Sequence, residues 1–262
     1  MGNINMRVII LGLIASLLTA CAAVPVVNES NMKKAAEINA ELGLGYMQQG
    51  RYETALYKLL KAIKEDPKNA DAHQYLAVLY SRLNRPEDAD RNFKKALKIM
   101  PDSTLSSRVA AVRNNYAVFL CKQKRYDEAN RYFEMVARDP LYQLRDRLFE
   151  NMAQCEQNKG NLHQAEEFFI KALKLNSRSS KSLLGLAQLD YDKGLYDQAQ
   201  VYLNKFLRYS THNAESLWLA ILIQRQRGNA KRAAEYAVRL KSKYPDSKEA
   251  QLLKQLEMQD SR

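Results

Sequence analysis

Cys21 is the residue of this 262-residue chain whose surroundings point most directly to chemistry. It ends an LTAC string (residues 18–21) that follows one positive charge, Arg7, and the apolar run 8–20. That run is too short to span a bilayer as a mature helix. Residues 1–21 are therefore typical of a bacterial lipoprotein signal peptide, in which the cysteine is diacylated and becomes the new N-terminus. An ordinary signal peptide or a buried helix is the alternative.

Lipidation of Cys21 predicts where the protein lies. One acyl chain anchors a protein only marginally, whereas several hold it firmly at a membrane. Ala22, rather than Asp, follows the cysteine, and in bacteria with two membranes this favours sorting to the outer membrane. We therefore expect a lipid-anchored protein on the periplasmic face, with residues 22–35 as a tether.

Cys121 and Cys155 are the two thiols that remain once Cys21 is lipidated. They stand 34 residues apart, and the periplasm is an oxidising compartment in which disulfides persist. A bridge requires that their α-carbons come within about 7 Å. The alternative is a pair of small buried thiols.

Other patterns that could carry catalysis or hold a cofactor are weak. His73, His163 and His212 are far apart and have no metal-ligand spacing to a cysteine or carboxylate. The string Gly43-Leu44-Gly45 lacks the third glycine of a dinucleotide-binding loop and follows no strand pattern. We therefore expect no enzyme activity, no cofactor and no metal, and we expect His73 to be a core histidine.

The chain is organised by small residues that recur at a nearly constant spacing. Stacked helix pairs approach closely only where a side chain is nearly absent, so each repeat needs a small residue at the same place. A turn residue precedes this residue by five positions in most repeats, and a large apolar residue follows it by four. The pattern resembles the tetratricopeptide repeat. The recurring residues are Ala55, Ala89, Ala129, Ala165, Ala199 and Ala233.

The spacing predicts an all-α fold, a right-handed α-solenoid of six tetratricopeptide repeats with a C-terminal capping helix. Residues 36–262 form this domain, and residues 247–258 have the pattern of the capping helix. No segment has the alternating β-branched pattern of a strand. The repeats are expected at 36–69, 70–103, 110–143, 146–179, 180–213 and 214–247.

The net charge of +12, or +11 after removal of the signal, raises the question of nucleic-acid binding. The basic residues are spread over all the repeats, and no zinc-finger, helix-turn-helix or RNA-binding motif is present. We therefore expect no nucleic acid as a partner. Solvated helix faces, with a bias toward acidic neighbours, explain the charge.

An array of such repeats binds its partners in a groove lined by the first helix of each repeat. An apolar strip in the first repeat would suit an apolar peptide, unless residues 31–35 fold back over it. The two asparagines can hold a peptide backbone or cap local structure, and the tryptophan can instead pack on the end helix. The residues expected in the groove are Ala40, Leu44, Met47, Asn114, Asn115, Tyr191 and Trp218.

The third and fourth repeats resemble a particular family. The strings NNYAVFLC (114–121), RYDEA (125–129), DPLY (139–142) and RLFEN (147–151) are similar to those of the PilF/PilW lipoproteins of type IV pilus biogenesis. The similarity extends over roughly residues 18–256. Some members have both cysteines, which favours the bridge between Cys121 and Cys155.

The resemblance implies a pilotin, an outer-membrane lipoprotein that helps the pilus secretin to reach that membrane and to assemble into its ring. The partners would then be the secretin and, through the lipid, the membrane; the oligomeric state stays open. The alternative is a repeat scaffold that serves outer-membrane protein assembly or peptidoglycan enzymes.

Overall fold

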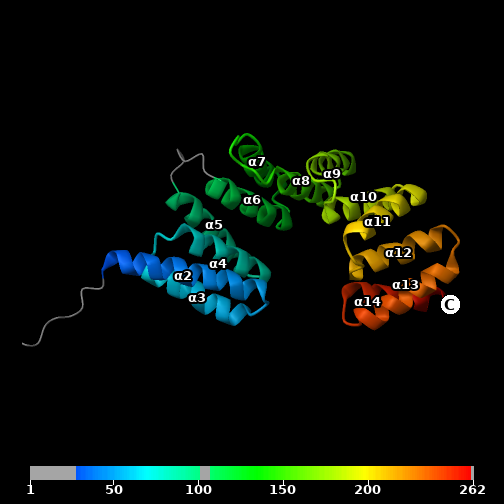
Figure 1. Ribbon diagram of the computed structural model, residues 1–262, viewed down its shortest axis with the longest axis horizontal. Coiled ribbons are helices and arrows are strands. Elements are labelled where there is room, and N and C mark those ends of the chain that lie inside the picture. Colours follow the sequence, from blue (N-terminus) through cyan, green and yellow to red (C-terminus); the bar gives the residue numbers. More distant parts are fainter. Residues whose placement is uncertain (1–27, 101–106, 261–262) are drawn as a thin grey trace, which may run out of the picture. The chain divides into compact units, whose positions relative to one another are not determined.

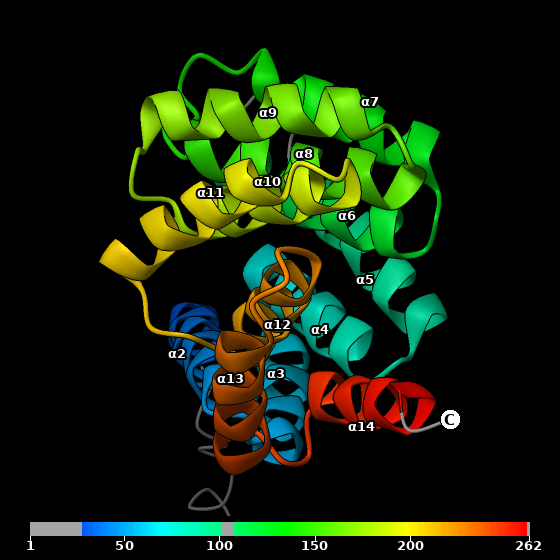
Figure 2. The ribbon, with the colours of Figure 1, turned by 90° about the vertical axis from the view of Figure 1, so that its right-hand side faces the viewer.

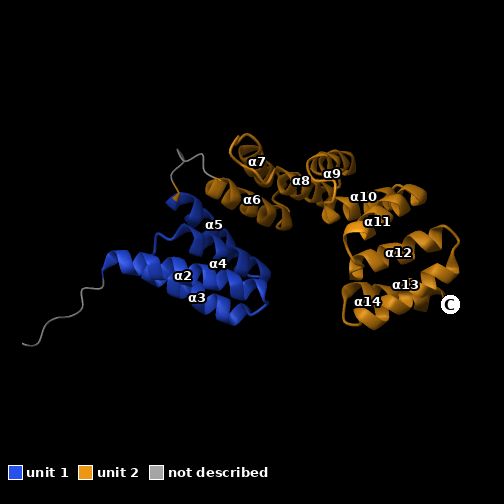
Figure 3. Cartoon of the chain, viewed as in Figure 1, with its two compact units in different colours: residues 1–99 blue, residues 100–262 orange. Residues whose placement is uncertain are grey.

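The computed structural model of the chain describes residues 28–100 and 107–260, and every regular element in these ranges is an α-helix (Figure 1). Cys21 lies outside the described residues, as does the first part of the expected tether. The chain divides into two compact units, residues 1–99 and 100–262 (Figure 3). In each unit consecutive helices pack as pairs, which confirms the predicted all-α tetratricopeptide fold.

The helix bounds follow the expected repeats. The first unit contains α2 (Glu29–Gln48), α3 (Tyr52–Glu65), α4 (Ala70–Arg82) and α5 (Pro86–Ile99). The second contains α6 (Ser107–Lys122), α7 (Tyr126–Ala137), α8 (Arg145–Lys159), α9 (Leu162–Leu175), α10 (Ser180–Asp192), α11 (Tyr196–Tyr209), α12 (Ala214–Gln226), α13 (Ala230–Lys243) and α14 (Lys248–Asp260). The first helices of successive repeats also contact one another, α2 with α4 in one unit, and α6, α8, α10 and α12 in the other.

The close helix crossings explain why small residues recur. All six alanines of the repeat spacing are buried, five of them completely. Two glycines bring helices still closer. A Cβ atom on Gly43 would lie 2.6 Å from the Cγ of Leu59, and one on Gly185 would collide with the ring of Phe169. No larger residue fits at these crossings unless the partner helix moves.

The turns within the repeats use the left-handed backbone region. Gly50, Gly160, Gly194 and Gly228 have φ between 72° and 93°, and Asn84 has φ of 56°. In the third repeat Lys124 takes this place with φ of 59°. Glycine and asparagine adopt this conformation easily and lysine does not. The third repeat therefore makes the same turn although its sequence has no typical turn residue at this position.

The first helix differs from the prediction, because α2 begins at Glu29 rather than near residue 36. Asn28 caps it, with its side-chain oxygen accepting from the amide of Ser30, and Lys33 pairs with Glu29 at 2.8 Å. Both interactions stabilise a first helical turn. Residues 29–35 are therefore helical rather than part of a tether, and they continue α2 instead of folding back over it.

The capping helix is present as α14, close to the expected bounds. Ser247 accepts the amide of Ala250 at its N-terminus. Ala250 and Leu253 then join the apolar cluster formed by α12 and α13. An ion pair from Arg225 to Asp260 adds to this contact. The helix thus covers apolar surface of α12 and α13 that a seventh repeat would otherwise bury.

Candidate functional site

An apolar surface lies open on the first helix. We call it the α2 apolar surface and define it by Ile38, Leu42, Gly45 and Tyr46. The side chains of Ile38 and Leu42 are 52% and 42% exposed, although both are large and apolar. These residues line a hollow of about 530 Å³, together with Glu37, Glu41 and Gln49. Exposed apolar surface rimmed by polar groups is typical of a protein-binding site.

The packing of α2 explains why this side is open. Gly43 and Ala40 face the opposite way, where Gly43 meets Leu59 of α3 and Ala40 joins a cluster with Ala62 and Ala72. Residues four apart lie on one face of a helix. Ile38, Leu42 and Tyr46 therefore form their own stripe, and within the described part of the first unit no helix precedes α2 to cover it.

This arrangement corrects the expected groove strip in the first repeat. Ala40 and Met47 are 1% and 3% exposed, so both belong to the core, and Leu44 is only partly exposed. The sequence shows apolar residues on several sides of this helix, and the repeat frame took as open a side that packs in the core. The spacing of Ile38 and Leu42, on the side away from Gly43, is the signal that could have identified them.

Charged groups surround the α2 apolar surface. Glu37 and Glu41 form part of its rim, and the hydroxyl of Tyr75 donates to Glu41 Oε1 at 3.2 Å. At the other end the guanidinium of Arg51 lies 4.5 Å from the ring centre of Tyr46. A bound segment would therefore meet an apolar floor with two carboxylates beside it.

The structure brings Asn114 into a polar chain across three first helices. Lys181 Nζ donates to Asn151 Oδ1 at 2.9 Å, and Asn151 Nδ2 donates to Asn114 Oδ1 at 3.3 Å. Burial lowers the pKa of the Lys181 amine, as does Lys122, while Glu150 opposes that shift. Because Asn114 is 6% exposed, its main contact here is with the neighbouring repeat rather than with an open groove.

The remaining groove candidates have separate surroundings. Asn115 is partly exposed on α6. Tyr191 packs against Tyr196 and the apolar cluster between α10, α11 and α12. Trp218 packs on the cluster that contains Ala250 and Leu253 of α14. Packing on the end helix is the alternative to a position in the groove. Tyr191 and Trp218 therefore belong to two different clusters of the second unit.

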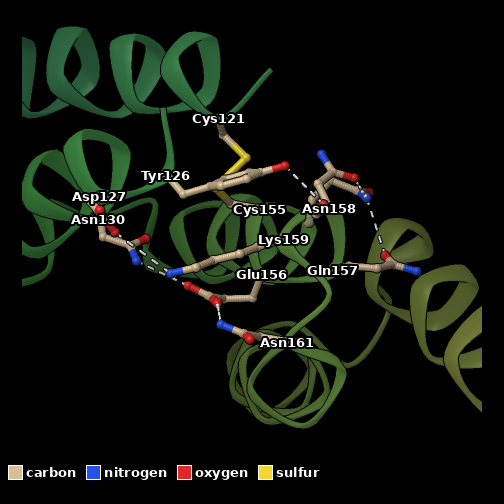
Figure 4. The surroundings of a disulfide bond; sticks show 11 residues. Cys121, Tyr126, Asp127, Asn130, Cys155, Glu156, Gln157, Asn158, Lys159 and Asn161 are labelled. Carbon is tan, nitrogen blue, oxygen red and sulfur yellow. Dashed lines mark hydrogen bonds and ion pairs between the residues drawn. A yellow bond between two sulfur atoms is a disulfide. The ribbon is translucent and has the colours of Figure 1, made fainter. Parts of the chain in front are cut away.

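Cys121 and Cys155 are joined by a disulfide between α6 and α8, with their α-carbons 5.6 Å apart (Figure 4). Polar contacts surround it. The hydroxyl of Tyr126 donates to the carbonyl of Asn158 at 3.0 Å. The buried carboxylate of Glu156 accepts from Asn130 at 3.2 Å and from Asn161 at 2.7 Å. The third and fourth repeats are thus linked both covalently and by hydrogen bonds.

Removing this bridge is expected to lower stability without changing the fold. A disulfide that closes a loop of 34 residues stabilises a protein by about 2–4 kcal/mol. We expect that loss in the free energy of unfolding when protein purified from the periplasm is reduced, and a mass increase of two hydrogens. Free alkylation of both thiols in the native, unreduced protein would contradict the bridge.

In the described ranges none of the three histidines belongs to a group of side chains that could hold a metal ion. His73 is buried, with its ring nitrogens 2.9 Å from Asn92 Oδ1 and 3.2 Å from the carbonyl of Pro67, as expected of a core histidine. Within residues 28–100 and 107–260, no group of three or more histidine, cysteine or acidic residues could hold a metal ion. None of the helices described is both long and apolar enough to cross a bilayer.

His212 gives the second unit a pH-dependent contribution to stability. Its ring packs against Tyr236 and lies 3.1 Å from the hydroxyl of Ser216. Burial lowers the pKa of His212 to about 4, helped by the cations of Arg239 and Lys243. Since an unfolded histidine titrates near 6.5, the folded protein binds fewer protons between these values. Its contribution is complete above pH 6.5 and is lost as the pH falls toward 4.

We therefore expect His212→Gln to unfold with a weaker dependence on pH than the wild type. Urea titrations at pH 7 and pH 4.5 measure the difference, and NMR titration of the ring should show a midpoint near 4. Equal pH dependence in the two proteins would show that His212 is not the responsible group.

Comparisons with known proteins show the family to which the chain belongs. Tetratricopeptide-repeat models match residues 43–84, 70–103, 109–139, 146–179 and 184–248. The type IV pilus assembly protein PilF of Pseudomonas aeruginosa is 36% identical over 251 residues, which is 94% of this chain and 97% of that protein. The chain belongs to the PilF/PilW family of type IV pilus biogenesis proteins.

Two solved structures show how closely this PilF/PilW family member follows known folds. The structure of Pseudomonas aeruginosa PilF matches with a TM-score of 0.68 and 37% identity, over 88% of this chain and 99% of that one. PilW, described as a widely conserved type IV pilus biogenesis factor, matches with a TM-score of 0.71 and 30% identity, over 83% of this chain and 97% of that one. Tetratricopeptide-repeat proteins are scaffolds that bind other proteins rather than catalysts.

Proposed function

We propose that this PilF/PilW family member is a pilotin, an outer-membrane lipoprotein that binds the pilus secretin and promotes its assembly into a multimer. The observation that carries this proposal is the α2 apolar surface, where Ile38 and Leu42 are partly open to solvent and line one hollow. The LTAC string that ends at Cys21 supports the lipid anchor. The similarity to PilF, a type IV pilus assembly protein, supports the pilus pathway.

The proposed mechanism is physical rather than chemical. A secretin subunit exposes apolar surface until it inserts into the membrane and meets its neighbours. The α2 apolar surface can cover a segment of that surface, and its hollow of about 530 Å³ accommodates a few side chains. Tethering by a lipid at Cys21 would keep the bound subunit close to the outer membrane and raise its effective concentration there.

The position of this surface suits a tethered partner. Ile38 lies nine positions after Glu29, where α2 begins, and a helix rises 1.5 Å per residue. The surface therefore lies about 14 Å along the helix from its N-terminal end. A secretin segment bound there would stay near the end of the chain that leads to the lipid.

A general scaffold for outer-membrane protein assembly or for peptidoglycan enzymes is the second candidate, because an open apolar surface does not by itself specify its partner. Co-purification distinguishes the two. From detergent-solubilised membranes, we expect the lipidated protein to retain the pilus secretin, and a strain lacking the protein should lose secretin multimers and twitching motility. Normal secretin multimers in that strain would reject the pilotin role in favour of the scaffold.

A further inference from the structure

Exposed cations recur on the second helices of the fourth and fifth repeats. Lys171 and Lys174 stand in the last part of α9, and Lys205 and Arg208 stand at the equivalent positions of α11, 34 residues later. All four side chains are exposed. The two helices have equivalent surroundings, since α9 packs between α8 and α10, and α11 between α10 and α12 (Figure 2). The cations are therefore open to solvent at the same place in both repeats.

These cations are not neutralised by the protein. Within the described ranges, no ion pair joins Lys171, Lys174, Lys205 or Arg208 to an acidic side chain. The acids in the first half of α9 have other partners, Lys193 for Glu166 at 2.6 Å and His163 for Glu167 at 3.7 Å. On α11, Asp197 pairs with Arg227 at 2.8 Å. The second halves of α9 and α11 thus keep an uncompensated positive charge.

Aromatic rings orient two of the four cations. Lys171 Nζ lies 5.0 Å from the ring centre of Phe168, and Lys205 Nζ lies 5.1 Å from that of Tyr202. The two rings occupy equivalent positions, three residues before each lysine. The ammonium groups are therefore held in the same way in both repeats, by a contact that favours a cation over a ring face.

Large apolar side chains are exposed among these cations. Ile170 and Leu175 on α9 are 38% and 56% exposed, and Val201 and Tyr209 on α11 are 51% and 49% exposed. The guanidinium of Arg178, just after α9, lies 5.7 Å from the ring centre of Tyr209 and so joins the two helices. Cations in the last turn can be explained by the helix dipole, but that explanation gives no reason for the exposed apolar side chains.

We infer that the outer faces of α9 and α11 bind the surface of an anionic phospholipid bilayer. Exposed cations gain from anionic head groups, and apolar side chains beside them gain from entering the boundary of the acyl region. An acidic protein would match both features only if its own apolar side chains lay opposite Ile170, Val201 and Tyr209, whereas an anionic bilayer offers head groups and an acyl boundary over its whole surface. The inference goes beyond the secretin role and does not depend on it, because the surface belongs to α9 and α11 and not to α2.

The test uses the chain from Ala22 onward, which lacks Cys21 and retains every residue that the structure describes. Its binding is measured by co-sedimentation with vesicles of phosphatidylcholine alone and of phosphatidylcholine mixed with phosphatidylglycerol. We expect binding only to the mixed vesicles, weakened by added salt because charges at a surface are screened. Equal binding to both kinds of vesicle, or binding to neither, would overturn the inference.

Two matched variants show whether these faces carry the binding. Lys171→Gln with Lys174→Gln, Lys205→Gln and Arg208→Gln should lower the partition coefficient by about a hundredfold or more. Each cation near an anionic bilayer contributes about a fivefold effect, and four such effects multiply. The control neutralises four other exposed cations of the second unit, Lys122, Arg147, Lys248 and Lys254, again to glutamine. It should bind nearly as the wild type does, whereas an equal loss in both variants would mean that only net charge matters.

A variant without any charge change tests the apolar part. Ile170→Ser with Val201→Ser should weaken binding several-fold while the protein stays folded at the temperature of the assay, because both side chains are partly exposed. A quadruple glutamine variant that melts at a lower temperature and still binds vesicles normally would assign the cations to helix stability alone and overturn the inference.

Discussion

Ile38→Lys combined with Leu42→Lys is expected to abolish secretin multimers while the protein remains folded. Ile38 and Leu42 are 52% and 42% exposed, so a lysine stem can lie along the surface while its charge reaches water. Each change should therefore alter the free energy of unfolding by about 1 kcal/mol or less. In a complex the same lysines would lie against apolar surface, where an unpaired charge is costly to desolvate. Loss of two central apolar anchors costs roughly 4 kcal/mol of binding, or on the order of a thousandfold in Kd.

The measurement is an immunoblot for heat-resistant secretin multimers in cells that produce the variant, with circular dichroism and thermal melts of the purified protein. The charge-matched control is Gln48→Lys with Gln123→Lys, two exposed positions outside the α2 apolar surface. It should support normal multimers. Met47→Lys should instead unfold the first unit, because Met47 is buried. Normal secretin multimers in the folded double variant would place the binding site elsewhere.

The substitution Cys21→Ser is expected to release the protein from the membrane. Without the thiol no acyl chain can be attached at this position, and the remaining sequence offers no described helix that could replace the anchor. The effective concentration of the protein at the outer membrane then falls by orders of magnitude, since tethering alone typically contributes a factor of about 100 or more. Secretin multimers should decrease or accumulate in the inner membrane.

Palmitate labelling followed by membrane fractionation measures both effects. Replacing the other two cysteines, with Cys121→Ser and Cys155→Ser, should leave the label and the membrane fraction unchanged, which assigns the label to Cys21. A Cys21→Ser protein that still carries the label would disprove the anchor. A soluble variant that supports normal multimers would separate the secretin role from the tether.

The repeat frame could be predicted from the sequence because it depends on a local requirement that every repeat must meet. A close crossing of two helices excludes large side chains, so Ala55 and its five equivalents recur at a fixed spacing and mark the crossings directly. The capping helix was predictable for a similar reason, since a serine cap and apolar residues at helical spacing are local signals. The start of α2 could not be predicted, because the cap at Asn28 and the ion pair of Glu29 with Lys33 are weak signals in the sequence.

The candidate site depended on tertiary structure, because exposure is a property of the neighbours of a helix. The sequence of α2 shows apolar residues on several sides, and periodicity alone does not say which side packs. The contact of Gly43 with Leu59 fixes the rotation of α2 on α3, which buries Ala40 and Met47 and leaves Ile38 and Leu42 open.

Contacts between residues distant in the sequence were decided in the same way. Nothing local to Asn114 indicates that it accepts a hydrogen bond from Asn151, 37 residues later. Trp218 packs on the cluster that includes α14, although its sequence position fits the groove equally well. The sequence by itself determined which residues form each helix pair, and it predicts Cys21 as a site of lipid attachment, because both depend on short spacings. Only the tertiary structure decided which side chains remain free to bind a partner, because burial depends on how one helix is rotated against the next.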